Sequence, residues 1–199
     1  MPKRVTYYMT VVSPWTYLGH DRFVALCAKH GATIDQKPID LGRVFPVSGG
    51  LPLKQRAPQR QAYRLVELAR WKAELAIPLN AQPRFAASGP DLAARWTFAA
   101  IERDARRALV FTSAVMRARW AEERDIADAA TLAACAQAAG LPADALAARA
   151  EAAEMGARYD AATQEAIDRQ VFGTPWYVID GEPFWGQDRL DFVARKLAQ

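Results

Sequence analysis

The chain has 199 residues, of which 51% are apolar and 10% aromatic, enough to bury the core of one large domain or of a domain with an insertion. The net charge of +4 comes from arginines interleaved with acidic residues, a pattern that argues against a nucleic-acid surface and favours small anionic partners. The first residues are too polar for a signal peptide and no apolar run is long enough to span a membrane, so we expect a cytoplasmic protein.

The first forty residues alternate between strand and helix patterns. Residues 5–12 form an apolar run typical of a strand, the pattern from 16 to 30 predicts a helix closed by Gly31, and residues 33–39 predict a second strand. This order is a β-α-β unit. Residues 40–58 then contain three prolines, a pair of glycines and no periodicity, which predicts a long surface loop of the kind that often carries function.

The middle of the chain has helical patterns only. We expect helices over residues 59–74, from about residue 91 to a break near Arg106, and over residues 111–123. Residues 128–155 are rich in alanine and are divided by Gly140-Leu141-Pro142, which predicts a closely packed helical hairpin. Another helix is expected over residues 157–170.

The end of the chain returns to strand patterns. Residues 176–179 and 183–185 read as strands joined by the hairpin turn Asp180-Gly181, and residues 187–197 read as a last helix. The predicted fold class is therefore α/β, a thioredoxin-like core with a large all-helical insertion. Residues 1–40 and 157–199 would form the core, and residues 41–156 the loop and the inserted helical domain.

Ser13 lies at the junction of the first strand and the first helix, where a thioredoxin-like chain carries its reactive cysteine. The stretch Ser13-Pro14-Trp15-Thr16 contains no sulfur and cannot cycle between dithiol and disulfide. An ordinary helix start, with Ser13 as N-cap and Pro14 as the first helical residue, would also explain this sequence. Ser13 is thus either a cap, an active-site hydroxyl, or both.

The second informative stretch is Gly173-Thr174-Pro175, directly before the third predicted strand. Proline at the start of a strand cannot donate to the sheet, and the Thr174-Pro175 bond is a candidate for the cis isomer. A rigid turn between helix and strand is the alternative. The pairing of this step with the Ser-Pro step at the first helix favours an active site formed by both.

The two cysteines and the two histidines do not match the spacing of any redox, metal-binding or catalytic motif. Cys27 and Cys135 are isolated within helical patterns and are expected to be buried, reduced thiols. No metal-ligand spacing is present, so we expect no metal site. Neither His20 nor His30 has a motif that would place it beside Ser13, so a hydrolase triad is poorly supported.

The whole chain resembles the 2-hydroxychromene-2-carboxylate isomerases, a group related to the kappa-class glutathione transferases and to disulfide-bond protein A-like thioredoxin folds. The resemblance is carried by Ser13-Pro14-Trp15-Thr16-Tyr17-Leu18, residues 39–44, residues 63–71 with Ile77-Pro78-Leu79, residues 171–175 and residues 184–190. It implies a glutathione-dependent isomerase of the bacterial breakdown of naphthalene-like aromatics, with Ser13 as the catalytic residue.

The resemblance also implies binding residues. Thr174 and Pro175 would hold the cysteinyl part of glutathione, and Trp185, Gly186, Gln187 and Asp188 would form the γ-glutamyl pocket. An aromatic carboxylate substrate would contact the loop and the first inserted helix, at Val44, Phe45, Leu53, Lys54, Arg60 and Phe85. Lys54, Arg56 or Arg60 could pair with its carboxylate.

The chain departs from the family pattern at Thr174 and Gln187, in the loop around Lys54, and at Arg60 and Phe85, so the physiological substrate stays open. Two other functions remain: a kappa-type glutathione transferase, and a redox-inactive thioredoxin-like binding protein. We expect no nucleic-acid or membrane partner, and the sequence allows a homodimer.

Overall fold

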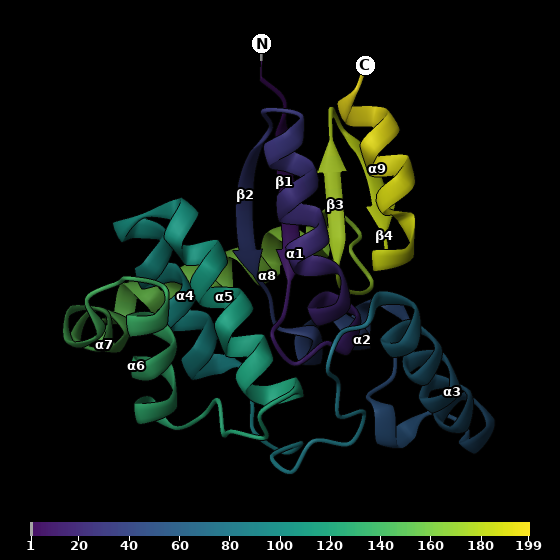
Figure 1. The fold of residues 1–199 in the computed structure, drawn as a ribbon, viewed down its shortest axis with the longest axis horizontal. Coiled ribbons are helices and arrows are strands. Elements are labelled where there is room, and N and C mark those ends of the chain that lie inside the picture. Colours follow the sequence, from purple (N-terminus) through teal and green to yellow (C-terminus); the bar gives the residue numbers. More distant parts are fainter. Residues whose placement is uncertain (1) are drawn as a thin grey trace.

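The computed structural model describes residues 2–199. A four-stranded sheet has the order β2-β1-β3-β4, with strands Arg4–Met9 (β1), Thr33–Pro38 (β2), Trp176–Ile179 (β3) and Glu182–Trp185 (β4). β1 runs parallel to β2 and antiparallel to β3, and the hairpin β3–β4 completes the sheet (Figure 1). The predicted β-α-β unit and terminal hairpin are confirmed.

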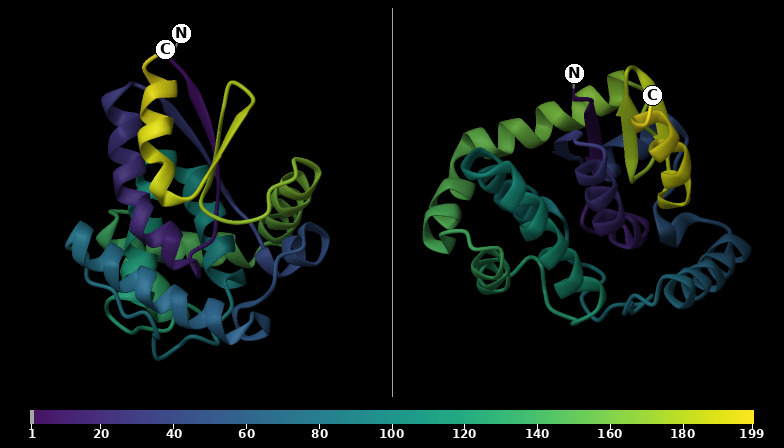
Figure 2. Two further views of the ribbon diagram at one scale, coloured as in Figure 1. Left: turned by 90° about the vertical axis from the view of Figure 1, so that its right-hand side faces the viewer. Right: turned by 45° about the horizontal axis from the view of Figure 1, so that its top comes forward.

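Helices cover both faces of this sheet. Helices α1 (Pro14–Lys29) and α9 (Leu190–Leu197) lie on one face, and α8 (Ala153–Asp168) crosses the other (Figures 1 and 2). Tyr7 of β1, Phe23 of α1 and Tyr177 of β3 are fully buried between sheet and helices, with ring centroids 4.4–5.4 Å apart. This aromatic cluster fixes the position of α1 on the sheet, and therefore of its N-terminus.

The inserted part is helical, as predicted. Its elements are α2 (Leu41–Ser48), a 3-10 turn (Leu53–Gln55), α3 (Pro58–Leu75), α4 (Asp91–Arg103), α5 (Ala105–Trp120), α6 (Ala129–Ala138) and α7 (Ala143–Glu151). Helices α4 to α7 pack together beside the sheet, whereas α3 stands on the opposite side of α1 (Figure 1). The division into residues 1–40 with 157–199 and residues 41–156 stays a prediction.

Three element boundaries differ from the sequence prediction. Residues 40–58 are not one loop, because Asp40 caps α2 by accepting the N–H of Gly42 at 2.7 Å and Val44 is buried. Helix α5 begins near residue 105, since Asp104 accepts the N–H groups of Arg106 and Arg107. Helix α8 begins at Ala153. Aspartate caps decided the starts of α2 and α5, where hydrophobic periodicity was weak, whereas α8 has no side-chain cap.

Candidate active site

Ser13 lies in the loop between β1 and α1 and caps the helix. Its Oγ accepts a hydrogen bond from the N–H of Thr16 at 3.2 Å, and Pro14 is the first helical residue. The same hydroxyl donates to the carbonyl oxygen of Thr174 at 3.3 Å. Because the first turn of α1 carries no acidic residue, the positive end of the helix dipole faces this hydroxyl without local neutralisation. Ser13 is therefore a cap, and its hydroxyl could donate a hydrogen bond to a bound group in place of the Thr174 carbonyl.

The Thr174 segment is brought to Ser13 from the far end of the chain. The Thr174–Pro175 peptide bond is cis, and the carbonyl of Pro175 accepts the N–H of Gly186 at 2.9 Å. In the register of the sheet, Tyr8 of β1 stands opposite Trp176, the first residue of β3. The two sequence stretches with proline steps thus meet at the end of the sheet where β1 ends and β3 begins.

Two further hydroxyls at this place have no hydrogen-bond partner. Thr16 Oγ1 and Thr174 Oγ1 are both buried and unpaired among residues 2–199. A buried polar group without a partner costs about 1–3 kcal/mol, so such groups are rarely retained without use. Both oxygens are enclosed by protein atoms, so they make the surroundings of Ser13 polar without being exposed themselves.

The stretch predicted to bind a γ-glutamyl group forms one wall beside Thr174. Trp185 is half-exposed and lies over Gly173, where an added Cβ would come within 2.7 Å of the indole Nε1. Phe172 packs edge-on against Trp185 with centroids 4.7 Å apart. Gly186 has a φ of 102°, which a residue with a side chain rarely adopts.

Gln187 and Asp188 differ in how accessible they are. Gln187 is buried, and its Oε1 accepts a hydrogen bond from Arg22 at 2.7 Å, so this side chain joins α1 to the turn before α9. Asp188 is exposed and pairs with Arg189 at 2.6 Å. Of the two side chains, the Asp188 carboxylate is the one that a ligand could reach.

The predicted substrate residues lie around α2, the 3-10 turn and α3. Phe45 packs under the Arg56 guanidinium, 5.8 Å from ring centroid to Cζ, and Leu53, Lys54 and Arg60 are exposed nearby. Val44 is fully buried, so its side chain does not reach the surface. Phe85 lies apart from this group, in the segment between α3 and α4. No hydrogen bond or ion pair among the described residues joins these six to Ser13.

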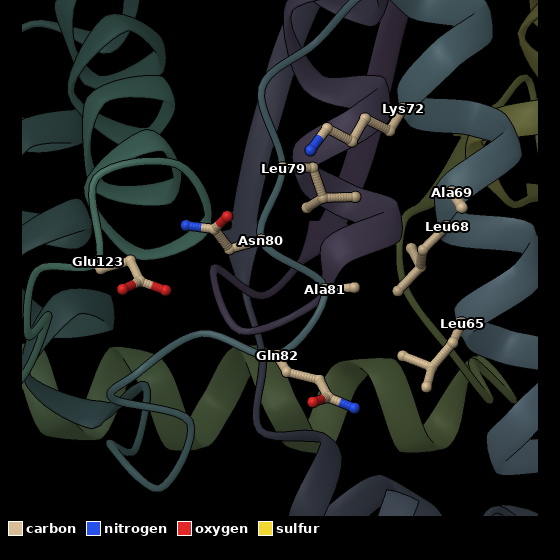
Figure 3. A pocket seen from close by; sticks show the side chains of 9 residues that line it. All are labelled: Leu65, Leu68, Ala69, Lys72, Leu79, Asn80, Ala81, Gln82 and Glu123. Atoms are coloured by element: carbon tan, nitrogen blue, oxygen red, sulfur yellow. The ribbon is translucent and has the colours of Figure 1, made fainter.

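The structure also has a pocket that the sequence did not reveal. A space of about 360 Å³ lies between α3 and residues 79–82 (Figure 3). Its wall is mostly apolar, and Asn80, Gln82, Lys72 and Glu123 supply polar groups; the complete lining is Leu65, Leu68, Ala69, Lys72, Leu79, Asn80, Ala81, Gln82 and Glu123. The spacing of Leu65, Leu68 and Ala69 indicates an apolar face of α3, which could have suggested this wall of the pocket. The opposite wall, residues 79–82, has no periodicity in its sequence and gave no such indication.

This pocket is linked to the loop that carries Ser13. The N–H of Asn80 donates to the carbonyl of Trp120 at 2.6 Å, and the indole N–H of Trp120 donates to the carbonyl of Val11 at 3.0 Å. The hydroxyl of Tyr17, on α1, donates to the carbonyl of Pro78 at 2.8 Å. Residues 78–80 are therefore held against both the β1–α1 loop and the first helix.

The other reactive groups are engaged elsewhere. Cys27 and Cys135 are buried and free, and burial raises their thiol pKa to about 12 and about 11. His20 is buried between the hydroxyl of Tyr7 and the carbonyl of Leu109, and burial lowers its pKa. Within residues 2–199, no three His, Cys, Asp or Glu side chains are grouped so that they could hold a metal ion, and no helix is long and apolar enough to cross a bilayer.

Comparison with known proteins gives consistent matches over the whole chain. The model of the DSBA-like thioredoxin domain matches residues 4–198. A 2-hydroxychromene-2-carboxylate isomerase of Sphingobium xenophagum is 31% identical over 199 residues, covering 99% of each chain. The same name is carried by a Pseudomonas putida protein that is 28% identical, over 94% of this chain and 90% of that one.

Solved structures agree with these sequence matches. A 2-hydroxychromene-2-carboxylate isomerase superposes with a TM-score of 0.81 at 28% identity, covering 98% of this chain and 94% of the other. The cytosolic disulfide reductase DsbM of Pseudomonas aeruginosa, solved with GSH, gives a TM-score of 0.68 at 16% identity over 98% and 96% of the chains. The second likeness concerns the fold alone.

Proposed function

The chain belongs to the 2-hydroxychromene-2-carboxylate isomerase family, on a DSBA-like thioredoxin fold, and from that premise we propose that it is a glutathione-dependent cis-trans isomerase of a ring-opening aromatic carboxylate. One observation carries the proposal: a serine hydroxyl, not a thiol, stands at the N-terminus of α1 in hydrogen-bond contact with Thr174. Such a site cannot exchange disulfides itself, but it can hold a thiol that is brought in.

The residues around Ser13 fit glutathione. The Ser13 hydroxyl would donate a hydrogen bond to its sulfur, and the exposed carboxylate of Asp188 would receive its ammonium group. When bound, glutathione would supply a thiolate that adds reversibly to the substrate double bond, which can rotate while it is single. Trp185 and Gly186 would line the γ-glutamyl end, while Gln187 would act through its contact with Arg22.

Ser13 would act by stabilising the thiolate. Lowering a thiol pKa of about 8.5 by two units requires about 2.7 kcal/mol of differential stabilisation. A charge-assisted hydrogen bond supplies about 1.5–3 kcal/mol and a helix N-terminus about 0.3–1 kcal/mol. The Ser13 hydroxyl and the free end of α1 together are therefore sufficient. In this role the serine donates a hydrogen bond to the sulfur and forms no covalent bond.

The substrate would bind between this site and the inserted helices. Phe45, Leu53 and Phe85 would contact its aromatic part, and Lys54 or Arg60 its carboxylate. Val44 would support Phe45 from the core. Cytoplasmic location and a homodimer remain predictions.

The test is isomerisation of 2-hydroxychromene-2-carboxylate with and without glutathione, followed by chromatography of the products. We expect activity only with glutathione, and a product that contains no sulfur. Ser13→Ala should lose at least 100-fold in kcat, while Ser113→Ala, a serine of α5 outside the site, should keep full activity. A glutathione conjugate as product would identify a transferase instead. Full activity of Ser13→Ala, or activity without glutathione, would contradict the proposal.

The Ser13 variants also separate catalysis from capping. Removing the cap should lower the free energy of unfolding by about 1 kcal/mol, or about 2–4 °C in Tm for a chain of this size. Ser13→Thr keeps a hydroxyl and should retain much of both the activity and the stability. Circular dichroism melts of the wild-type protein, Ser13→Ala and Ser13→Thr therefore show whether lost activity reflects lost structure.

A further inference from the structure

The turn before α9, residues 186–188, is fixed from two sides. On one side, the N–H of Gly186 donates to the carbonyl of Pro175 at 2.9 Å, which ties the turn to the cis-proline segment. On the other side, the turn meets α1, which lies beside α9 on the same face of the sheet (Figures 1 and 2). There Gln187 is 1% exposed, and its Oε1 accepts a hydrogen bond from Nη1 of Arg22 at 2.7 Å. The side chain of Gln187 therefore faces the helix instead of the surface.

Gly19 lets α1 come close to this turn. A Cβ added to Gly19 would lie 2.6 Å from the Cβ of Gln187 and 3.4 Å from its Cα, and the first of these distances is shorter than real Cβ contacts. Glycine weakens the interior of a helix, because it loses more conformational freedom on folding than alanine does. The close contact explains why it is present here. Gly19 and Arg22 are three residues apart, so they form one surface of α1 that holds Gln187.

The same helix also carries Ser13. Ser13 caps α1 six residues before Gly19, which corresponds to about 9 Å along the helix axis at about 1.5 Å per residue. An extended dipeptide spans about 7 Å, and the γ-linkage of glutathione inserts two more carbon atoms between its ammonium group and its thiol. The two distances are comparable. Helix α1 thus fixes both the hydroxyl that would face the sulfur and the turn whose exposed Asp188 would face the ammonium group.

We propose that Arg22 is a positioning residue. Its hydrogen bond to Gln187, together with the close contact at Gly19, holds Asp188 where the γ-glutamyl ammonium group binds. This inference rests on the proposed function and deepens it, because it concerns which thiols the site accepts. A thiol without the γ-glutamyl group gains nothing from a correctly placed Asp188, so Arg22 would determine selectivity for glutathione over shorter thiols. The guanidinium itself would touch no ligand.

The experiment is calorimetric titration at pH 7.5 with glutathione and with cysteinylglycine, which keeps the thiol and the glycine but lacks the γ-glutamyl group. We expect wild-type protein to bind glutathione at least about tenfold more tightly than cysteinylglycine. Arg22→Met should lose about fivefold or more in affinity for glutathione and less than about twofold for cysteinylglycine, so the ratio of the two affinities falls. Arg22→Lys keeps a charged donor and should restore most of that ratio. Lys29→Met, at an exposed position of the same helix, is the matched control and should leave both affinities unchanged.

Two further measurements separate positioning from other roles of Arg22. At saturating glutathione, kcat of Arg22→Met should stay within about twofold of wild type, because Ser13 is unchanged. Arg22→Met/Gln187→Met should bind glutathione within about twofold of Gln187→Met alone, since Arg22 acts only through Gln187. A further loss of about fivefold in the double variant would place the guanidinium against glutathione itself and overturn the positioning role. Gly19→Ala moves the turn without removing a polar group, and it should lose affinity for glutathione as Arg22→Met does.

Equal losses of affinity for both thiols in Arg22→Met would reveal a general structural effect and overturn the inference, as would an unchanged ratio of the two affinities. Unchanged binding of glutathione by Gly19→Ala would contradict the part assigned to Gly19. Failure of glutathione to bind wild-type protein would instead contradict the proposed function. Circular dichroism melts identify any variant that is unfolded at the temperature of the titration. In that case Arg22→Gln replaces Arg22→Met, because a polar side chain suits this half-buried position.

Discussion

Ser13, the N-cap of α1, and His20, within α1, have opposite surroundings. Ser13 has one hydrogen bond to its own helix and one across to Thr174, with unpaired hydroxyls beside it. His20 is fully enclosed, with both ring nitrogens in contact with protein groups. Since its Nε2 must donate to the carbonyl of Leu109, Nδ1 accepts the hydroxyl of Tyr7 when the ring is neutral. The first residue is available for chemistry, and the second joins α1 to α5.

The buried ring of His20 predicts acid sensitivity. In the folded protein the pKa of His20 is lowered, because burial disfavours the charged ring. In the unfolded chain the pKa of the same ring is about 6.5, so below that pH the unfolded chain binds more protons than the folded protein. Stability is therefore retained above pH 6.5 and is lost as pH falls, by up to about 1.4 kcal/mol per pH unit. Urea unfolding between pH 7.5 and 5.5 measures this slope.

The matched variant for this measurement is His20→Gln. It should be less stable than wild type at pH 7.5, because the two buried hydrogen bonds are imperfectly replaced, but it should lose most of the dependence on pH in that interval. An equal slope in both proteins would show that other groups cause the acid sensitivity.

Among the elements, residues 85–88 of the segment between α3 and α4 are held by a buried arginine. Arg119, near the end of α5, donates to the carbonyls of Phe85, Ala86 and Ser88 at 2.9–3.3 Å. This segment has no regular structure over most of its length and carries Phe85, one of the expected substrate contacts. Arg119 therefore satisfies three backbone carbonyls of this segment, which has no helix or strand to pair them.

Replacing Arg119 by methionine should be costly. The change keeps most of the side-chain volume but leaves three carbonyls without their donor, so we expect a loss of about 1–3 kcal/mol in the free energy of unfolding. Arg117→Met, on the same helix but exposed and paired with Glu122, should change stability by less than about 1 kcal/mol. Chemical denaturation of both variants makes the comparison. Similar losses in the two proteins would argue against a special role of Arg119.

At the scale of the whole molecule, the inserted helices and the sheet share one hydrophobic core. Buried residues of the sheet, such as Tyr7 and Tyr177, belong to the same contact cluster as Trp96 and Phe111 of the inserted helices. The hydrogen bonds of Trp120 to Val11 and of His20 to Leu109 connect the same two parts. A shared core does not allow one part to unfold while the other keeps its apolar surface covered.

We therefore expect unfolding in a single transition. Far-ultraviolet circular dichroism reports all helices, and fluorescence reports tryptophans in both parts, including Trp96 and Trp176. The two urea curves should coincide, as two-state unfolding requires. Midpoints that differ by more than the experimental error would show that the inserted helices form an independent unit.

The sequence alone determined the order of the elements, the cap at Ser13, the burial of both cysteines and the family. These depend on local spacing, on short polar motifs and on resemblance along the chain, all of which can be read without coordinates. The sequence did not predict α2, because Gly42 and Pro46 are unfavourable in a helix. The Asp40 cap and the buried side chain of Val44 stabilise this helix in the folded protein.

Only the tertiary structure decided which groups share a site. The contact of Ser13 with Thr174 spans 161 residues, and the pocket facing α3 includes residues 79–82, whose sequence has no pattern. It also showed that Gln187 and Val44 are buried. Burial and charge pairing depend on neighbours from distant parts of the chain. A serine that caps a helix therefore becomes a candidate hydrogen-bond donor to a thiolate only when the fold brings the Thr174 segment beside it.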